Sequence, residues 1–257
     1  MSERRLEGKV ALISGGAGGA GGAASRLFAV EGARVAILDI QQEAGRRTVE
    51  EIRAKEGDAT FIEADVSDPD QVKRGVSAAI EQFGRIDVLM NHAGTVIVKP
   101  FLETTLEDYD RLMDINVKSM FMVTQAVLPG MLERGSGVIV NTSSISGVTA
   151  SPLESLYCIT KGAVLQLTRA IAVEYRDRGI RCNALCPGFI RTPHGLREID
   201  ELVAMGETTV SEDISASQGR MCEPEEVARA ALFLAGDDSS FVNGSALFVD
   251  NAWTAAT

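Results

Sequence analysis

Several features that define common protein classes are scarce in this chain of 257 residues. It has only two histidines, and its four cysteines lack the paired spacing of a zinc site. We therefore expect no metal centre and no His-based catalytic triad. The cysteines are interpreted as reduced thiols of a cytoplasmic protein: Cys158, Cys182, Cys186 and Cys222.

Basic charge and long apolar runs are also lacking. The formal net charge is -11, whereas nucleic acids and anionic membranes attract basic surfaces. No apolar stretch approaches the roughly 20 residues of a membrane span, and the charged segment Met1–Gly8 does not resemble a signal peptide. We therefore expect neither a nucleic acid nor a membrane as a partner.

What the chain does contain is a regular alternation of apolar strand candidates with helical stretches. This alternation predicts an α/β protein, with a doubly wound parallel seven-stranded sheet (Rossmann fold) and helices on both faces. No composition break marks a second domain, so residues 1–257 are predicted to form a single domain. The seven predicted strands are Val10–Ile13, Arg34–Asp39, Ala59–Ala64, Ile86–Met90, Val138–Asn141, Ile180–Leu185 and Ala246–Val249.

The helices are expected between these strands, and one segment is expected to have no regular structure. Residues 191–222, mixed in charge, are predicted to be an irregular insertion that serves as a substrate loop. The predicted helices run from the glycine-rich turn to about Gly32, and over Gln41–Glu56, Asp68–Gly84, Leu106–Leu132, Ser155–Arg178 and Glu223–Ala235.

A glycine-rich turn, Ser14–Gly22, separates the first strand from the first helix. Glycines in this place let backbone N–H groups approach a pyrophosphate at the helix N-terminus. Two templates fit the run, because Gly16, Gly18 and Gly21 match one spacing and Gly15, Gly19 and Gly21 match another. The turn alone leaves this register open.

An acidic residue, Asp39, ends the second strand about 20 residues after the glycines. A carboxylate there can accept hydrogen bonds from the ribose hydroxyls of NAD and would repel the 2′-phosphate of NADP. No basic residue lies within the turn or directly after Asp39, so the sequence favours NAD. The competing interpretation is that Asp39 is only a turn residue at the strand end.

Tyr157 and Lys161 are spaced i and i+4 on a predicted helix that follows a strand ending near Ser143 and Ser144. This spacing places a phenol and an ammonium on one helix face, where the positive charge favours the phenolate. Alone, the pair is as easily explained by an ordinary amphipathic helix.

Together these motifs resemble the short-chain dehydrogenase/reductase family, in its single-domain branch of about 250 residues. Ser14-Gly15 with Gly19 and Gly21 is similar to the family's glycine motif, which settles the register. Ser144 lies thirteen residues before Tyr157, the family's usual spacing, so we choose it over Ser143. The other matching motifs are Asp65-Val66, Asn91-His92-Ala93-Gly94, Asn116 in Asp114–Val117, Pro187-Gly188, and Ile190 with Thr192.

The resemblance implies reversible hydride transfer between NAD and a secondary alcohol or ketone. Tyr157 would be the general acid/base, Lys161 would bind the nicotinamide ribose, Ser144 would hydrogen-bond the reacting oxygen, and Asn116 would hold a proton-relaying water. Gly18 and Ala20 of the turn and Ile40 after the second strand complete the expected cofactor contacts. The expected cofactor-binding residues are thus Gly15, Gly18, Gly19, Ala20, Gly21, Asp39, Ile40, Asp65, Val66, Asn91, Ala93, Gly94, Tyr157, Lys161, Pro187, Gly188, Ile190 and Thr192, with no metal ligands.

The resemblance also implies a homotetramer, in which the helices around 106–132 and 155–178 pair across a two-fold axis. Those helices carry apolar residues beyond the face that can cover a sheet. They are Met113, Met120, Phe121, Met122, Val127, Leu128, Val164, Leu165, Leu167 and Ile171.

Three departures from the family pattern stand out: Ala20 within the glycine turn, His92 in place of a second Asn, and Val249–Ala252 near the C-terminus. They affect helix packing, local hydrogen bonds and a subunit contact rather than the chemistry. A nucleotide-sugar epimerase shares the Tyr/Lys spacing but needs a further C-terminal domain. A catalytically silent NAD-binding relative, acting as a sensor or structural protein, is the remaining alternative.

The sequence leaves the substrate open. Pocket walls are expected from residues 95–98, 145–156 and 189 to about 221. An apolar pocket is suggested by Val96, Val148, Leu153, Phe189 and Leu196, whereas a hydroxyl-rich or anionic substrate is suggested by Glu154, Arg191, His194 and Arg197.

Overall fold

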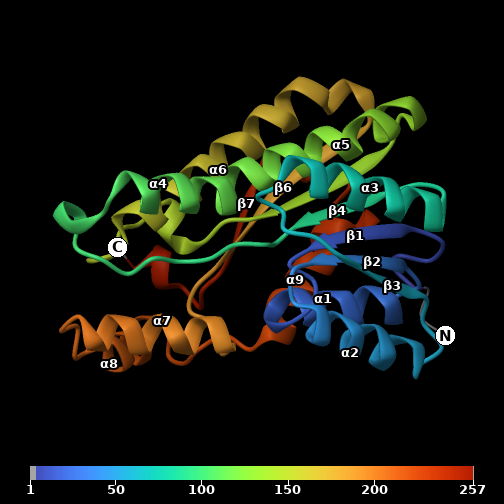
Figure 1. Ribbon diagram of the computed structural model, residues 1–257. Coiled ribbons are helices and arrows are strands. Elements are labelled where there is room, and N and C mark those ends of the chain that lie inside the picture. Colours follow the sequence, from blue (N-terminus) through green and yellow to red (C-terminus); the bar gives the residue numbers. More distant parts are fainter. Residues whose placement is uncertain (1–3, 257) are drawn as a thin grey trace.

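One parallel seven-stranded sheet forms the centre of the computed structural model, which describes residues 4–256 (Figure 1). The strand order is β3-β2-β1-β4-β5-β6-β7. The first three strands extend the sheet in one direction, and the chain then crosses back to place β4 on the other side of β1. All pairs are parallel, as the predicted Rossmann fold requires. The strands are β1 (Val10–Ser14), β2 (Arg34–Asp39), β3 (Ala59–Glu63), β4 (Val88–Asn91), β5 (Gly137–Thr142), β6 (Ile180–Pro187) and β7 (Ala246–Val249).

Both faces of the sheet are covered by helices, and β1 shows why its sequence is apolar throughout. Val10 and Leu12 pack into the core on one face, and Ala11 and Ile13 into the core on the other. None of these four side chains is exposed. Figure 1 shows α1, α2 and α9 on one face and α3, α5 and α6 on the opposite face. The predicted doubly wound architecture is therefore confirmed.

The helices begin and end near the predicted residues wherever local capping signals are strong. Asp68 accepts hydrogen bonds from the N–H groups of Asp70 and Gln71 at the start of α3, with Pro69 in its first turn. Gly84, with φ of 84°, ends that helix. The helices are α1 (Gly19–Val30), α2 (Gln42–Arg53), α3 (Pro69–Phe83), α4 (Leu106–Met113), α5 (Ser119–Arg134), α6 (Ser155–Tyr175), α7 (Pro193–Ala204), α8 (Val210–Ser217) and α9 (Pro224–Ala235).

The long helix predicted over 106–132 is interrupted, which corrects the prediction. A π-helical turn, Asp114–Lys118, joins α4 to α5 and contains the fully buried Asn116. One extra residue in a helical turn shifts the following face without changing the overall apolar pattern. Hydrophobic periodicity therefore does not reveal it.

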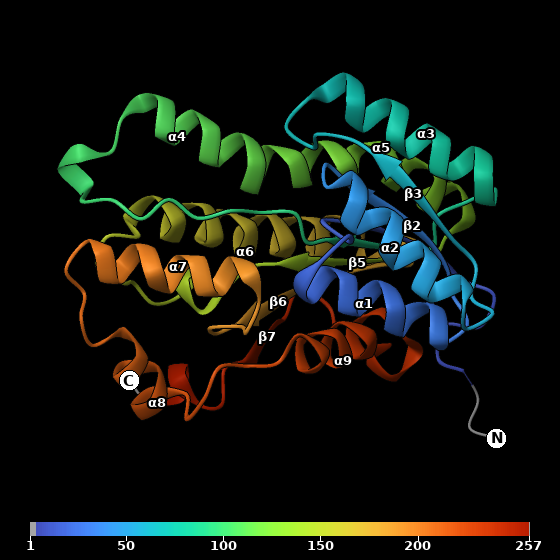
Figure 2. The ribbon, with the colours of Figure 1, turned by 60° about the horizontal axis from the view of Figure 1, so that its bottom comes forward.

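The segment 191–222, predicted to be irregular, contains α7 and α8. Thr192 caps α7 by accepting a hydrogen bond from Gly195 N–H (3.0 Å), and Pro193 occupies the first turn. The two helices enclose a small apolar cluster of Leu202, Val210, Ile214 and Met221. Both lie to one side of the sheet, away from the N-terminus (Figures 1 and 2).

Residues Ser155–Arg178, α6 and the turn after it, are long and apolar enough to cross a membrane by length and composition alone. The sequence predicts no such stretch. This helix packs against β6 and against the short turn Ile145–Gly147, and 44% of its most apolar 18-residue segment is buried inside the protein. Packing on the sheet thus accounts for part of its apolar character.

Candidate active site

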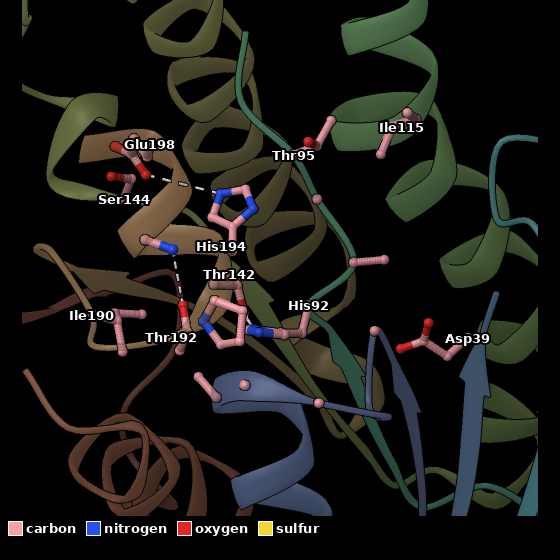
Figure 3. Close-up of a pocket in the computed structure, with 18 of the residues that line it drawn as sticks. Asp39, His92, Thr95, Ile115, Thr142, Ser144, Ile190, Thr192, His194 and Glu198 are labelled. Atoms are coloured by element: carbon pink, nitrogen blue, oxygen red, sulfur yellow. Dashed lines mark hydrogen bonds and ion pairs between the residues drawn. The ribbon is translucent and has the colours of Figure 1, made fainter. Parts of the chain in front are cut away.

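A cavity of about 1110 Å³ lies at the carboxyl ends of the central strands. Asp39 lines one end, and Ser144, Tyr157 and Lys161 line the other (Figure 3 shows Asp39 and Ser144). Most of the predicted site residues lie on its wall, which is where ligands bind in open α/β sheets. The exceptions are Gly21, Asn91 and Asn116, which lie behind the wall.

The glycine turn forms the floor of the cavity between its two ends. Gly15 has φ of 70°, and a side chain on Gly21 would overlap the Gly15 carbonyl oxygen. Gly18 precedes α1, which has neither a side-chain cap nor an acidic residue in its first turn. The N–H groups of that turn are therefore available to an anion, and the site fits a dinucleotide pyrophosphate.

Asp39 combines a structural contact with a position on the cavity wall. Its Oδ2 accepts a hydrogen bond from Ala17 N–H and its Oδ1 from Gln41 N–H, both at 3.0 Å. Each carboxylate oxygen keeps a further lone pair for a ribose hydroxyl. Ile40 and Arg47 line the same end, so a cation on α2, the helix that follows Asp39, stands near it.

Asp65 and Val66, which follow β3, also line the end near Asp39. Asp65 Oδ1 accepts hydrogen bonds from both the N–H and the hydroxyl of Ser67, at 2.9 and 2.7 Å. These bonds fix the loop in which Val66 is buried. The arrangement presents a loop edge and an apolar side chain to a ligand.

Asn91, predicted to bind cofactor, instead has its side chain in the core. Its Nδ2 donates to Thr124 Oγ1 (3.0 Å) and Asn141 Oδ1 (2.9 Å), which ties β4 to α5 and β5. The neighbours His92, Ala93 and Gly94 do line the cavity. Asn91 therefore supports the wall from behind, which the strand-end position alone did not distinguish from direct contact.

His92 stands where the related motif has a second Asn. Its Nδ1 lies 3.1 Å from Thr142 Oγ1. Burial lowers the pKa of His92 to about 4, and the charge of Lys161 adds to this effect. The imidazole is thus neutral at neutral pH and serves as a hydrogen-bonding group.

The structure distinguishes the two serines at the end of β5. Ser144 lines the cavity with Tyr157 and acts to lower the pKa of that phenol, and its Oγ accepts a hydrogen bond from Ser146 N–H (3.1 Å). Ser143 Oγ instead donates to the Lys161 carbonyl oxygen (2.8 Å). Ser144 is accordingly the serine paired with the tyrosine.

Tyr157 does not show the lowered pKa that the sequence analysis expected from Lys161. Burial raises its pKa above the usual value, and the negative charges of Glu198 and Glu154 raise it further. Lys161 Nζ lies 5.4 Å from the Tyr157 ring centre and is itself buried, which lowers its pKa to about 8. When no cofactor is bound, Tyr157 is therefore a neutral phenol.

Lys161 and Asn116 both form hydrogen bonds with backbone groups beside the cavity. Lys161 Nζ donates to the Thr142 carbonyl oxygen (3.1 Å). Asn116 Oδ1 accepts from Thr95 N–H (2.8 Å), while its Nδ2 donates to the Thr95 carbonyl oxygen (2.8 Å) and to Thr160 Oγ1 (3.0 Å). Asn116 thus holds the Thr95 segment against α6, and its Oδ1 keeps one further lone pair.

The segment after β6 closes the cavity. Pro187, Gly188, Ile190 and Thr192 all line it. Gly188 packs so closely against Gln218 that a side chain there would overlap Gln218 Oε1. Ile190 forms a parallel bridge with Cys222, which anchors both ends of the α7–α8 segment.

The polar wall next to Tyr157 differs from the one predicted. His194 and Arg197 line the cavity, but Arg191 pairs with Glu223 (3.1 Å) away from it. Glu198, which the sequence analysis missed, lies on the wall with its side chain 12% exposed, and Glu154 is buried behind it. The signal was the i, i+4 spacing of His194 and Glu198, which has meaning only if residues 193–204 are helical.

The expected apolar wall is largely absent. Of its five residues only Phe189 lines the cavity. Val148 and Leu196 are exposed, Val96 is buried, and Leu153 packs with the α7–α8 cluster. Within residues 4–256 no group of His, Cys, Asp or Glu is arranged to hold a metal ion.

Comparisons with known proteins agree with this geometry. The family model for enoyl-(acyl carrier protein) reductase matches residues 15–254. A 2-(R)-hydroxypropyl-CoM dehydrogenase of Xanthobacter autotrophicus is 40% identical, with 96% of this chain and 99% of that protein covered. Levodione reductase has a solved structure that superimposes with a TM-score of 0.93, at 35% identity over 98% of this chain and all of that one.

A further solved structure bears on the cofactor. It is a putative NAD(P)-dependent gluconate 5-dehydrogenase from Beutenbergia cavernae, with NADP bound at low occupancy. It is 30% identical, covers 99% of this chain and all of its own, and has a TM-score of 0.88. The family binds a nicotinamide cofactor, and its members include dehydrogenases that act on CH–OH groups. This chain belongs to the short-chain dehydrogenase/reductase family and is an oxidoreductase of that family.

Proposed function

We propose that the protein is an NAD-dependent oxidoreductase that interconverts a secondary alcohol and a ketone, with Tyr157 moving the proton. The observation that supports this most is that Ser144 and Tyr157 line the same cavity as the glycine turn. A hydroxyl pair can bind one substrate oxygen while the rest of the cavity holds a dinucleotide.

The nicotinamide supplies the hydride acceptor or donor when it is bound. Ser144 Oγ orients the substrate oxygen by donating a hydrogen bond to it. Tyr157 exchanges the proton of that oxygen. Because burial keeps Tyr157 protonated, the resting protein is ready to act as the acid in ketone reduction, whereas alcohol oxidation requires the phenol to lose its proton first.

Lys161 is proposed to hold the nicotinamide ribose and to couple Tyr157 to a proton relay. Asn116 is proposed to hold a water in that relay. Its Nδ2 is occupied by Thr95 and Thr160, so such a water would donate to the remaining lone pair of Asn116 Oδ1.

NAD is proposed over NADP because Asp39 is a buried, acceptor-only group on the cavity wall. Arg47 on the same wall is the feature that opposes this choice. The proposed cofactor preference therefore depends on which of the two side chains the adenosine ribose meets.

A homotetramer remains our proposal, on a set of residues that shares only Phe121 with those first expected. Met120, Val127, Leu128, Val164, Leu165 and Ile171 are buried inside the chain. The outer faces of α4, α5 and α6 instead expose Tyr109 (42%), Phe121 (48%), Ile159 (49%) and Val173 (66%). Apolar side chains gathered on these helices suit contact with a second copy.

We further propose one domain over residues 1–257, a cytoplasmic location, and small-molecule alcohols or ketones as partners rather than nucleic acid or membrane. The location is supported by four cysteines that are all free thiols in the structure.

A panel of secondary alcohols with NAD⁺ and with NADP⁺, followed by absorbance of the reduced nicotinamide, tests the proposal. We expect turnover of at least one alcohol, faster with NAD⁺. Tight cofactor binding without turnover of any alcohol or ketone would support the silent NAD-binding relative instead.

A further inference from the structure

Two glutamates, Glu154 and Glu198, meet beside the proposed reaction centre without a role in the mechanism above. Glu154 is 1% exposed, and it lies close enough to Glu198 for each carboxyl group to shift the pKa of the other. Glu198 extends from α7 onto the cavity wall that also carries Ser144 and Tyr157 (Figure 3). The pair thus connects a buried carboxyl to the space where a substrate would lie.

The pair needs a proton. In residues 4–256, Glu154 Oε1 is one of two buried side-chain atoms for which no hydrogen-bond partner is found. Two adjacent ionised carboxylates in a buried place repel each other and lack donors. A proton shared between them removes one charge and supplies the missing donor.

The surrounding charges agree with this arrangement. Burial raises the pKa of both carboxyl groups, which favours a proton held between Glu154 and Glu198. Arg197 on α7 and Lys161 on α6 act in the opposite direction. Tyr157, also on α6, faces the pair and is affected by both of its charges.

We propose that Glu198, held by Glu154 as its positioning residue, hydrogen-bonds a second oxygen of the substrate and selects alcohols that carry a hydroxyl next to the reacting carbon. This inference rests on the proposed function. A protonated carboxyl offers one donor and one acceptor, which matches a hydroxyl group. An alcohol without the second hydroxyl leaves the carboxyl unsatisfied, and this is how a polar site rejects an apolar analogue.

An ammonium in place of the second hydroxyl is the competing ligand, and the structure disfavours it. His194 Nε2 lies 3.9 Å from Glu198 Oε2, so an imidazolium there would have an acidic neighbour. Even so, burial together with Arg197 and Lys161 lowers the pKa of His194 to about 4. A position that keeps an imidazole neutral beside a carboxyl also disfavours a substrate cation.

The test compares cyclopentanol, its vicinal diols and its vicinal amino alcohols, which share one ring. Binding is measured by calorimetry to the enzyme with NADH, on which an alcohol cannot react, and kcat/KM is measured with NAD⁺. The wild-type protein should bind at least one diol stereoisomer roughly ten- to hundredfold more tightly than cyclopentanol, as for a hydrogen bond to a buried polar group. The kcat/KM ratio should follow the same order.

Two variants separate the hydrogen bond from the shape of the site. Glu198→Leu should lower the diol preference to about onefold while changing cyclopentanol binding less than about threefold, and Glu198→Gln, which keeps a donor and an acceptor, should retain most of it. An equal loss for both alcohols in Glu198→Leu, or tighter binding of the amino alcohol than of the diol, would overturn the inference.

An infrared spectrum of the wild-type protein at neutral pH tests the shared proton without turnover. It should show a protonated-carboxyl band that Glu198→Gln lacks, and its absence from the wild-type protein would overturn the shared proton. Diol-selective binding without turnover would refute the proposed function but not this subsite. Turnover without diol selectivity would refute the subsite alone.

Discussion

Replacing Asp39 by Asn removes the charge that the cofactor's adenosine ribose is proposed to meet and nearly preserves the side-chain shape. Asp39 is 6% exposed and lines the cavity. At an effective dielectric constant of about 20, two unit charges about 5 Å apart interact by about 3 kcal/mol. The 2′-phosphate carries about 1.5 to 2 charges, so Asp39 opposes NADP by about 5 kcal/mol before Arg47 is considered.

Arg47 on the same wall carries the opposite charge but is exposed, so solvent screens its attraction for the phosphate and it offsets about half of this repulsion. The remaining 2 to 3 kcal/mol corresponds to a preference for NAD of about a hundredfold, at about 1.4 kcal/mol per tenfold. In Asp39→Asn the ratio of kcat/KM values should fall to about ten or less. Asn keeps an acceptor for only one of the N–H groups of Ala17 and Gln41, which now bond different oxygens, so the glycine turn should be weakened by about one hydrogen bond.

The assay measures kcat/KM for NAD⁺ and NADP⁺ with one alcohol in wild type, Asp39→Asn and Arg47→Ala. Arg47→Ala should widen the preference for NAD about tenfold or more, and thermal unfolding controls for damage to the fold. A wild-type ratio near one, or an unchanged ratio in Asp39→Asn, would show that the ribose does not lie against Asp39.

Three further predictions concern the turn, pH and assembly. Gly21→Ala should lower the free energy of unfolding in urea by about 1–3 kcal/mol, because a methyl group there overlaps the Gly15 carbonyl. The control Gly18→Ala should unfold like the wild type, because nothing lies within 4 Å of its added carbon. In the unfolded state His92 has the ordinary pKa of 6.5, whereas burial lowers its pKa to about 4 in the folded state. The free energy of unfolding should therefore fall by about 2 kcal/mol from pH 7 to pH 5, and His92→Asn should abolish that part of the loss. Light scattering should show a tetramer that Phe121→Glu weakens; a single 27.4 kDa species in the wild type would contradict it.

The order of strands and the carboxyl-edge location of the site could be predicted because both depend on repeated patterns. Buried strands such as Val10–Ser14 are apolar on both faces, and parallel connections place their carboxyl ends together. The start of α3 could likewise be predicted, because Asp68 and Pro69 stabilise the first turn of the helix through local contacts. Local chemistry and sheet periodicity thus determined this much of the structure.

What could not be predicted depends on contacts between distant segments. The π-helical turn holds Asn116 against Thr95, and one inserted residue leaves no mark on the apolar pattern. Asn91 is at a strand end like the residues that line the cavity, yet its partners lie on α5 and β5. The sequence predicts residues 193–204 to be irregular, whereas they form a helix. The i, i+4 spacing that places Glu198 beside His194 therefore could not be recognised from the sequence.

Tyr157→Phe tests the central claim most directly, because it removes the phenol hydroxyl from the cavity wall and retains the ring. General acid/base catalysis contributes about 10²–10⁴-fold, so kcat for alcohol oxidation should fall by at least about a hundredfold. The dissociation constant for NADH, measured by fluorescence titration, should change less than about threefold. A kcat within about tenfold of wild type would contradict the proposal that Tyr157 moves the proton.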